Sequence, residues 1–118
     1  MSIDADDEIL QDFLVEERAV SPDLVAVEGD RGLIGAEDRR LGVLINEEDH
    51  LRIQALASGL EPENAYRIAS QYDEEIGRFV EFDYDPDFGY LTACPTNVGT
   101  GMWVSVMLHM PALVMTHQ

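Results

Sequence analysis

Positive charge and cysteine are both scarce in this sequence. Its 118 residues hold 24 aspartates and glutamates against seven arginines and no lysine, so the formal net charge at pH 7 is −17. Nucleic acids and anionic membrane surfaces both attract basic proteins, so we expect neither as a partner. The single cysteine, Cys94, excludes an intrachain disulfide and favours a reducing, cytoplasmic setting.

Long hydrophobic runs are also missing. No apolar stretch approaches the ~20 residues that a membrane span requires, and the acidic segment 1–8 lacks the basic and apolar regions of a signal peptide. A hydrophobic content of 46% is nevertheless too high for a disordered acidic chain. We therefore expect one modest folded unit, with an N-terminal helix and linker over residues 1–30 and the remaining elements over 31–118.

The spacing of apolar residues predicts a mixture of helices and antiparallel strands. Helices are expected over 6–18 and 62–80, where apolar residues recur at helical intervals, and from Pro111. Strands are expected over 32–36, 41–46, 50–56, 90–93 and 102–109. Segment 41–56 resembles a hairpin, and 83–89 reads as a loop. The fold class is thus α+β, an antiparallel sheet with helices packed on one face.

The tip of the predicted hairpin, Asn46-Glu47-Glu48-Asp49, carries three consecutive carboxylates. Such groups repel one another unless they hold a cation, and a planar guanidinium matches a carboxylate through two parallel hydrogen bonds. Arg52, just beyond the tip, can hold an anion such as phosphate. The combination suits phosphoryl transfer to a guanidinium, whereas a solvated acidic turn is the commoner use of such residues.

A second candidate is the segment Cys94-Pro95-Thr96-Asn97-Val98-Gly99-Thr100-Gly101. A cysteine at the mouth of a turn can be a thiolate of lowered pKa, and successive N–H groups in a glycine-bearing turn can cradle an anion. The alternative is a buried structural thiol before a strand. Histidines 50, 109 and 117 lack the spacing of a zinc site, and segment 83–87 lacks the glycine and distal glutamate of a calcium loop.

Together, Asn46–Arg52 and Cys94–Thr100 resemble the guanidino-binding motif and the cysteine motif of the ATP:guanido phosphotransferases, the phosphagen kinase family. Within the family, segments 52–54, 98–101 and 105–114 are most similar to the bacterial protein arginine kinases, which phosphorylate arginine side chains of proteins. The resemblance runs from about residue 13 to the end. It implies a glutamine-synthetase/guanido-kinase type of fold, in which residues 31–118 form part of the catalytic domain.

The resemblance also implies a role for each motif residue. Glu48 clamps the substrate guanidinium and can deprotonate it, Cys94 orients it as a thiolate, and Asn97 belongs to the same site. Arg52 contacts the nucleotide phosphates. The nucleotide site is further lined by Trp103, Val104, Ser105, Val106 and Met107. Catalysis is then mainly positioning and charge stabilisation around an in-line transfer from ATP, with Mg²⁺ bridging the phosphates.

The sequence departs from the family at several points. Trp103 replaces an arginine of the nucleotide site, which can cost on the order of 10³-fold in rate, and Arg18 replaces a histidine. The family's upstream arginine-pair motif and downstream glycine-rich loop are absent, so we expect about half of a kinase site. Three interpretations stay open. They are an incomplete kinase segment acting on protein arginines or a small guanidino compound (completed by the rest of the domain or a second copy), a pseudokinase that binds arginine or a partner, and an acidic folding unit without a site.

Overall fold

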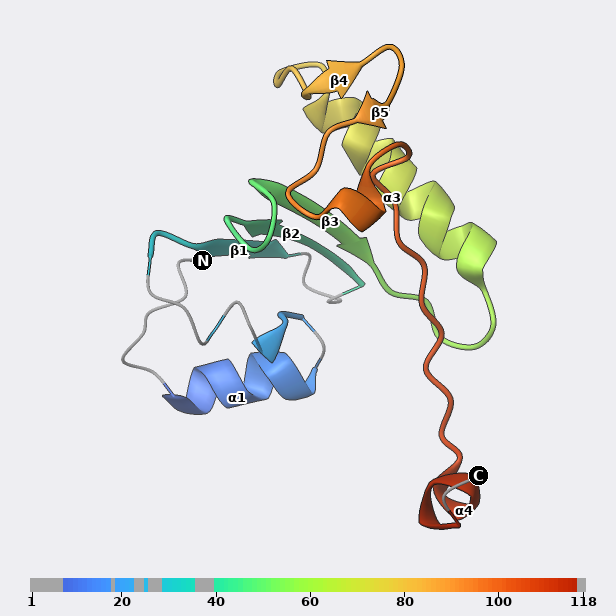
Figure 1. The fold of residues 1–118 in the computed structure, drawn as a ribbon. Coiled ribbons are helices and arrows are strands. Elements are labelled where there is room, and N and C mark those ends of the chain that lie inside the picture. The colour runs from blue at the N-terminus through green and yellow to red at the C-terminus, as the bar shows by residue number, and fades with distance from the viewer. Residues whose placement is uncertain (1–7, 18, 23–24, 26–28, 36–39, 117–118) are drawn as a thin grey trace.

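A computed structural model describes residues 8–17, 19–22, 25, 29–35 and 40–116 (Figure 1). The elements follow the order α1 Glu8–Glu16, β1 Gly32–Gly35, β2 Leu41–Ile45, β3 Leu51–Ala55, α3 Pro62–Ile76, β4 Tyr84–Asp85, β5 Gly89–Tyr90, the short 3-10 helix η1 Pro95–Asn97, and α4 Pro111–Met115. The first three strands form one antiparallel sheet, and β4 and β5 form another. The mixed antiparallel fold expected from the sequence is therefore confirmed.

The core joins α1 to the three-stranded sheet. It consists of Leu14, Val20, Leu33 and Leu44, and Leu33 lies directly opposite Leu44 in the register of β1 and β2. These contacts cross the boundary that the sequence suggests at residue 30. The described part of α1 ends at Glu16, while the expected start at residues 6–7 and the substituted Arg18 lie outside the described residues.

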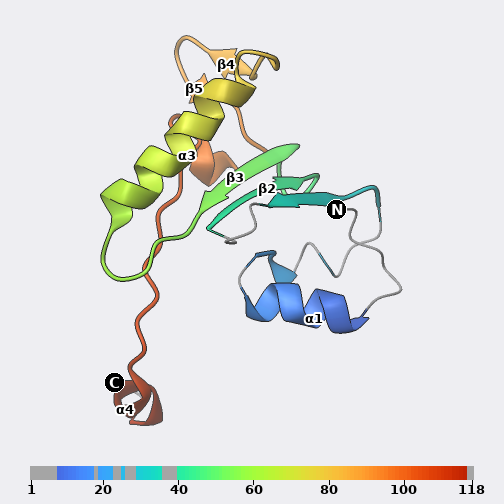
Figure 2. The same cartoon turned by 180° about the vertical axis from the view of Figure 1, so that it is seen from behind.

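Helices α1 and α3 lie on opposite sides of the three-stranded sheet (Figures 1 and 2). The expectation that helices pack on one face is therefore wrong for these two helices. The reason is the composition of β2, which is apolar throughout: Val43 and Leu44 are neighbours, point to opposite faces, and are both buried. A strand with two apolar faces needs a cover on each side, and α3 lies against β3.

Helix α3 begins at Pro62, as the sequence predicts, but it ends at Ile76 and not at residue 80. Gly77 follows as the cap, and its N–H donates to the Asp73 carbonyl at 2.8 Å. The next residues form tighter turns, which leave Phe79 89% exposed although its spacing fits the apolar stripe of the helix. No described helix is both long enough and apolar enough to cross a membrane.

Residues 83–89, expected to be a loop, contain a short hairpin. Its turn is held by the Asp85 carboxylate, whose Oδ1 accepts the N–H groups of Asp87 at 2.8 Å and Phe88 at 3.1 Å. Gly89 has φ +85°, and a side chain there would meet the Gly99 carbonyl at 2.5 Å. The predicted strand 90–93 is reduced to Tyr90, because only that residue pairs, with β4 on one side and with Gly99 on the other.

The strand predicted over 102–109 is wrong. This segment has no regular secondary structure and its residues are exposed. A strand requires hydrogen bonds to a neighbour, and within the described ranges none of the strands pairs with the segment. Figure 1 shows it running away from the sheet to α4, which begins at Pro111 as expected.

Candidate functional site

The hairpin that carries the acidic tip is confirmed, with β2 paired to β3 in antiparallel register. Asn46 starts the loop in the left-handed region, at φ +54°, a conformation that asparagine tolerates better than most residues. Its N–H donates to the His50 carbonyl at 3.0 Å, and its side-chain amide donates to the Asp30 carbonyl at 2.8 Å. These bonds close the loop 46–50 and fix where its three carboxylates begin.

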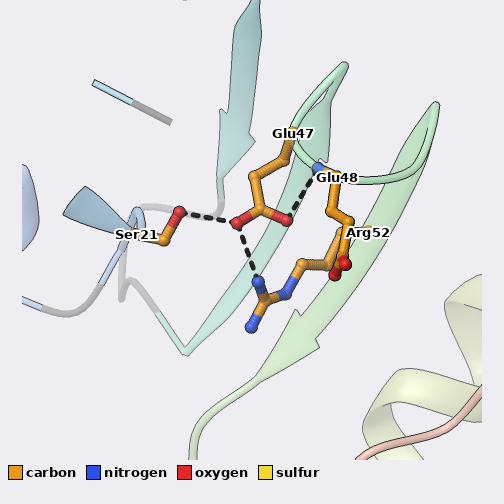
Figure 3. A network of polar contacts seen from close by, with 4 residues as sticks. All are labelled: Ser21, Glu47, Glu48 and Arg52. Atoms are coloured by element: carbon orange, nitrogen blue, oxygen red, sulfur yellow. Dashed lines mark hydrogen bonds and ion pairs between the residues drawn. The ribbon is translucent and has the colours of Figure 1, made fainter. Parts of the chain in front are cut away.

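Glu47 turns toward the protein and is the most strongly held of the three carboxylates (Figure 3). Its side chain is only 7% exposed. One carboxylate oxygen accepts the Ser21 hydroxyl at 2.6 Å and an Arg52 N–H from Nη1 at 2.9 Å, while the other accepts the Glu48 N–H at 3.0 Å. Glu47 therefore forms an ion pair with one edge of Arg52 and links the N-terminal segment to the hairpin.

These contacts shift the acidity of Glu47. Burial raises its pKa, but the hydrogen bonds from Ser21, the Glu48 N–H and Arg52, together with the charge of Arg52, lower it by more. The pKa of Glu47 consequently lies below its ordinary value of 4.5. The sequence gives no signal that separates Glu47 from Glu48, because both are glutamates of the same loop.

A loss of stability in acid follows from the lowered pKa. The unfolded chain binds a proton at Glu47 more readily than the folded chain does, so this stabilisation is complete above pH 4.5 and is lost as the pH falls through the folded-state pKa. Urea unfolding at a series of pH values measures it. We expect Glu47→Gln to unfold with a shallower pH dependence below pH 4.5 than the wild type, whereas the exposed control Glu81→Gln keeps the wild-type slope. Equal slopes in both variants would contradict the assignment.

The cysteine-bearing segment 94–101 is a compact turn. It opens with η1, where the Asn97 N–H donates to the Cys94 carbonyl at 3.0 Å, and it closes through a pair of hydrogen bonds between Tyr90 and Gly99 at 2.9 and 3.1 Å. Cys94 is half-buried, and its Sγ lies 2.9 Å from the Thr96 hydroxyl oxygen. The thiol therefore lies in a polar environment. Asn97, three residues further along the chain, is also half-buried.

A single hydrogen bond joins this turn to the acidic tip. The Asp49 carboxylate accepts the N–H of Ala93 at 2.6 Å, across 44 positions of the chain. The structure thereby brings the loop that carries Glu48 next to the residue that precedes Cys94. Glu48 itself is exposed, and no described residue donates to its carboxylate or forms an ion pair with it. Of the three carboxylates at the tip, Glu48 is the one whose oxygens accept no hydrogen bond from a described residue.

Of the residues expected to line the nucleotide site, only Arg52 and Trp103 are in contact with each other among the interactions of the described residues. The Arg52 guanidinium carbon lies 5.9 Å from the centre of the Trp103 ring, so these two residues meet. Residues Val104, Ser105, Val106 and Met107 continue along the exposed segment, and within the described fold no hydrogen bond or ring contact joins them to Arg52. Nor does the described part of the chain hold three metal-ligating side chains in one group. His117 lies outside it.

Comparison with known proteins supplies the family. The family profile "ATP:guanido phosphotransferase, C-terminal catalytic domain" matches residues 1–118. The chain is 49% identical over 106 residues to the protein-arginine kinase of Symbiobacterium thermophilum, which is 90% of this chain and 30% of that protein. It is 45% identical to that of Moorella thermoacetica with the same coverage, and 43% identical over 110 residues to that of Desulforamulus reducens, covering 93% and 31%.

The chain thus spans about 30% of the length of these relatives. The match covers residues 1–118 and so includes the N-terminal residues that precede the resemblance from about residue 13. The two motifs, their attachment through Asp49, and the match along the full chain agree, and we conclude that the chain belongs to the ATP:guanido phosphotransferase family, within its C-terminal catalytic domain.

Proposed function

We propose that this chain provides the guanidinium-binding part of a protein-arginine kinase catalytic domain, which transfers the γ-phosphoryl group of ATP to an arginine side chain. One observation carries the proposal: Glu48 is an exposed carboxylate without a described cation partner, on a loop that Asp49 ties to the Cys94 turn. The names of the relatives, all protein-arginine kinases, support this choice of substrate.

The three carboxylates at the tip differ in their bonding partners. Glu47 pairs with Arg52, and one Asp49 oxygen accepts the Ala93 N–H. Glu48 is therefore the tip carboxylate with both oxygens unbonded to any described residue. A carboxylate can accept two parallel hydrogen bonds from a guanidinium. In the proposed reaction a guanidinium nitrogen bonds to the γ-phosphorus as the bond from that phosphorus to the ADP oxygen breaks, and ADP leaves. Glu48 holds the guanidinium and accepts the proton that its nitrogen loses, while Cys94 and Asn97 orient the group.

Arg52 is the proposed contact for the nucleotide phosphates. Its side chain is 34% exposed, and only Nη1 is engaged, by Glu47, which leaves the N–H groups of Nε and Nη2 without a partner in the described structure. Those groups suit phosphate oxygens. Bound ATP supplies the γ-phosphoryl group, and Mg²⁺ neutralises the charge of the phosphates. Trp103 and the residues Val104, Ser105, Val106 and Met107 are the proposed lining of this side of the site.

The activity is proposed for the domain of which the chain forms part, because the chain covers about 30% of its relatives. The proposed partners are arginine side chains of proteins, or a small guanidino compound, together with the rest of the catalytic domain or a second copy. A cytoplasmic location belongs to the same proposal. An alternative is a binding module that binds arginine but transfers no phosphoryl group to it. The loss of the family's phosphate-contacting arginine at position 103, where this chain has Trp103, favours that alternative.

Ligand binding by the full chain tests the proposal and separates it from the alternative. In calorimetric titrations we expect arginine to bind, and citrulline, which has the same shape without the positive charge, to bind far more weakly. ATP with Mg²⁺ is expected to bind as well. Transfer of the phosphoryl group is measured separately, by ³¹P NMR detection of phosphoarginine. Equal affinity for arginine and citrulline, or none for either, would overturn the proposal. Arginine binding without ATP binding would favour the binding module.

A further inference from the structure

We propose that Trp103 is a positioning residue for Arg52: its indole ring holds the guanidinium so that the unpaired N–H groups face a polyphosphate. This inference rests on the proposed role of Arg52 in nucleotide binding. It adds a function for a residue that occupies the place of a family arginine. The contact that carries it is the 5.9 Å approach of the Arg52 guanidinium carbon to the centre of the Trp103 ring.

The guanidinium of Arg52 is held in two different ways. At its edge, the guanidinium donates one N–H to Glu47 at 2.9 Å. Over its plane, the positive charge is attracted by the face of the Trp103 ring. A contact with an aromatic face consumes no N–H donor and does not neutralise the charge. The remaining donors, on Nε and Nη2, therefore stay available, and no described group occupies them. A second carboxylate in place of the ring would compete with phosphate for the same donors.

The identity of the residue matters for this role. Tryptophan is the best of the aromatic side chains for attracting a cation. A leucine would offer only bulk, and a second arginine would repel Arg52 in the absence of an anion. Trp103 is 71% exposed and belongs to the segment without regular secondary structure, so Arg52 also ties that segment to the hairpin. Since Trp103 is the only tryptophan of the chain, its fluorescence reports on the contact directly.

The first test measures the emission of Trp103 in the full chain without any ligand. We expect Arg52→Met to change the emission maximum and intensity, because a cation leaves the neighbourhood of the ring. The control Arg78→Met removes an exposed arginine beyond α3 and should leave the spectrum unchanged. Identical spectra for the wild type and a folded Arg52→Met would overturn the inference.

The second test uses inorganic triphosphate as the probe and does not depend on the folding of the Arg52 variant. Calorimetry should show an affinity about two- to fivefold weaker in Trp103→Leu, the loss expected for a partly exposed cation–π contact, and intermediate in Trp103→Phe. Unchanged or tighter binding in Trp103→Leu, or no triphosphate binding by the wild type, would overturn the inference.

The arginine titrations separate this outcome from a failure of the proposed function. A wild type that ignores arginine contradicts the proposed function whatever the emission spectra show. A wild type that binds arginine, with triphosphate affinity indifferent to Trp103, contradicts only the positioning role.

Discussion

Replacing Glu48 by glutamine is expected to weaken arginine binding by about ten- to a hundredfold while leaving the fold intact. The substitution keeps the size of the side chain but removes the charge, and a hydrogen bond to a charged group contributes roughly 1.5–3 kcal/mol. Folding should be unaffected, because Glu48 is exposed and its carboxylate is not bonded to any described residue. Calorimetric titration with arginine and circular dichroism of the variant measure the two effects.

The matched control is Glu81→Gln, which removes the same charge from an exposed glutamate in the turn beyond α3. Both variants lower the net negative charge by one, so a general electrostatic attraction of arginine to an acidic protein would weaken binding equally in each. Wild-type affinity in Glu48→Gln, or an equal loss in Glu81→Gln, would show that Glu48 is not the specific carboxylate of the site.

Replacing Leu44 by alanine is expected to lower the free energy of unfolding by about 2–5 kcal/mol. Leu44 is the only described side chain that is fully buried and large, and it packs with Leu14, Val20 and Leu33 between α1 and the sheet. The truncation removes apolar contacts and leaves a cavity that the surrounding strands fill only in part. Small domains have a total stability of about 5–15 kcal/mol, so the loss is a large fraction of it.

Urea unfolding followed by circular dichroism measures this effect, and Leu60→Ala is its control. Leu60 is 77% exposed, in the loop before α3, and we expect its truncation to change stability by no more than about 0.5 kcal/mol. A loss for Leu44→Ala as small as that for Leu60→Ala would mean that α1 does not pack on the sheet in solution.

The elements that the sequence predicts well are those with strong local signals. Pro62 marks the start of α3, and the apolar run before the acidic tip together with the alternating segment after it predicts the β2–β3 hairpin. Both signals depend on residues close together in the chain. Gly77 ends α3 early because glycine is a poor helix former. The sequence predicts a loop where β4 and β5 form a hairpin, although the Asp85-Pro86-Asp87 turn has the chemistry for one.

Other features depend on contacts that no local pattern contains. The alternation over 102–109 is typical of a strand, but a strand also needs a partner, and none of the described strands provides one. Likewise, Glu47 differs from Glu48 in part because Ser21, 26 positions earlier in the chain, donates a hydrogen bond to it. The family resemblance predicted a shared site for the acidic tip and the Cys94 turn, and the roles of Glu48 and Cys94 stay predictions for experiment.

The Asp49–Ala93 hydrogen bond joins two parts of the chain that lie on either side of α3 in sequence. Between these two residues the chain runs through β3, α3 and the β4–β5 hairpin, so α3 sets the return path of the chain although none of its residues is proposed to touch a substrate. One residue inserted into α3 would turn everything beyond it by about 100° and carry the thiol away from the carboxylate. The length of α3 therefore helps to set where the Cys94 turn meets the acidic tip.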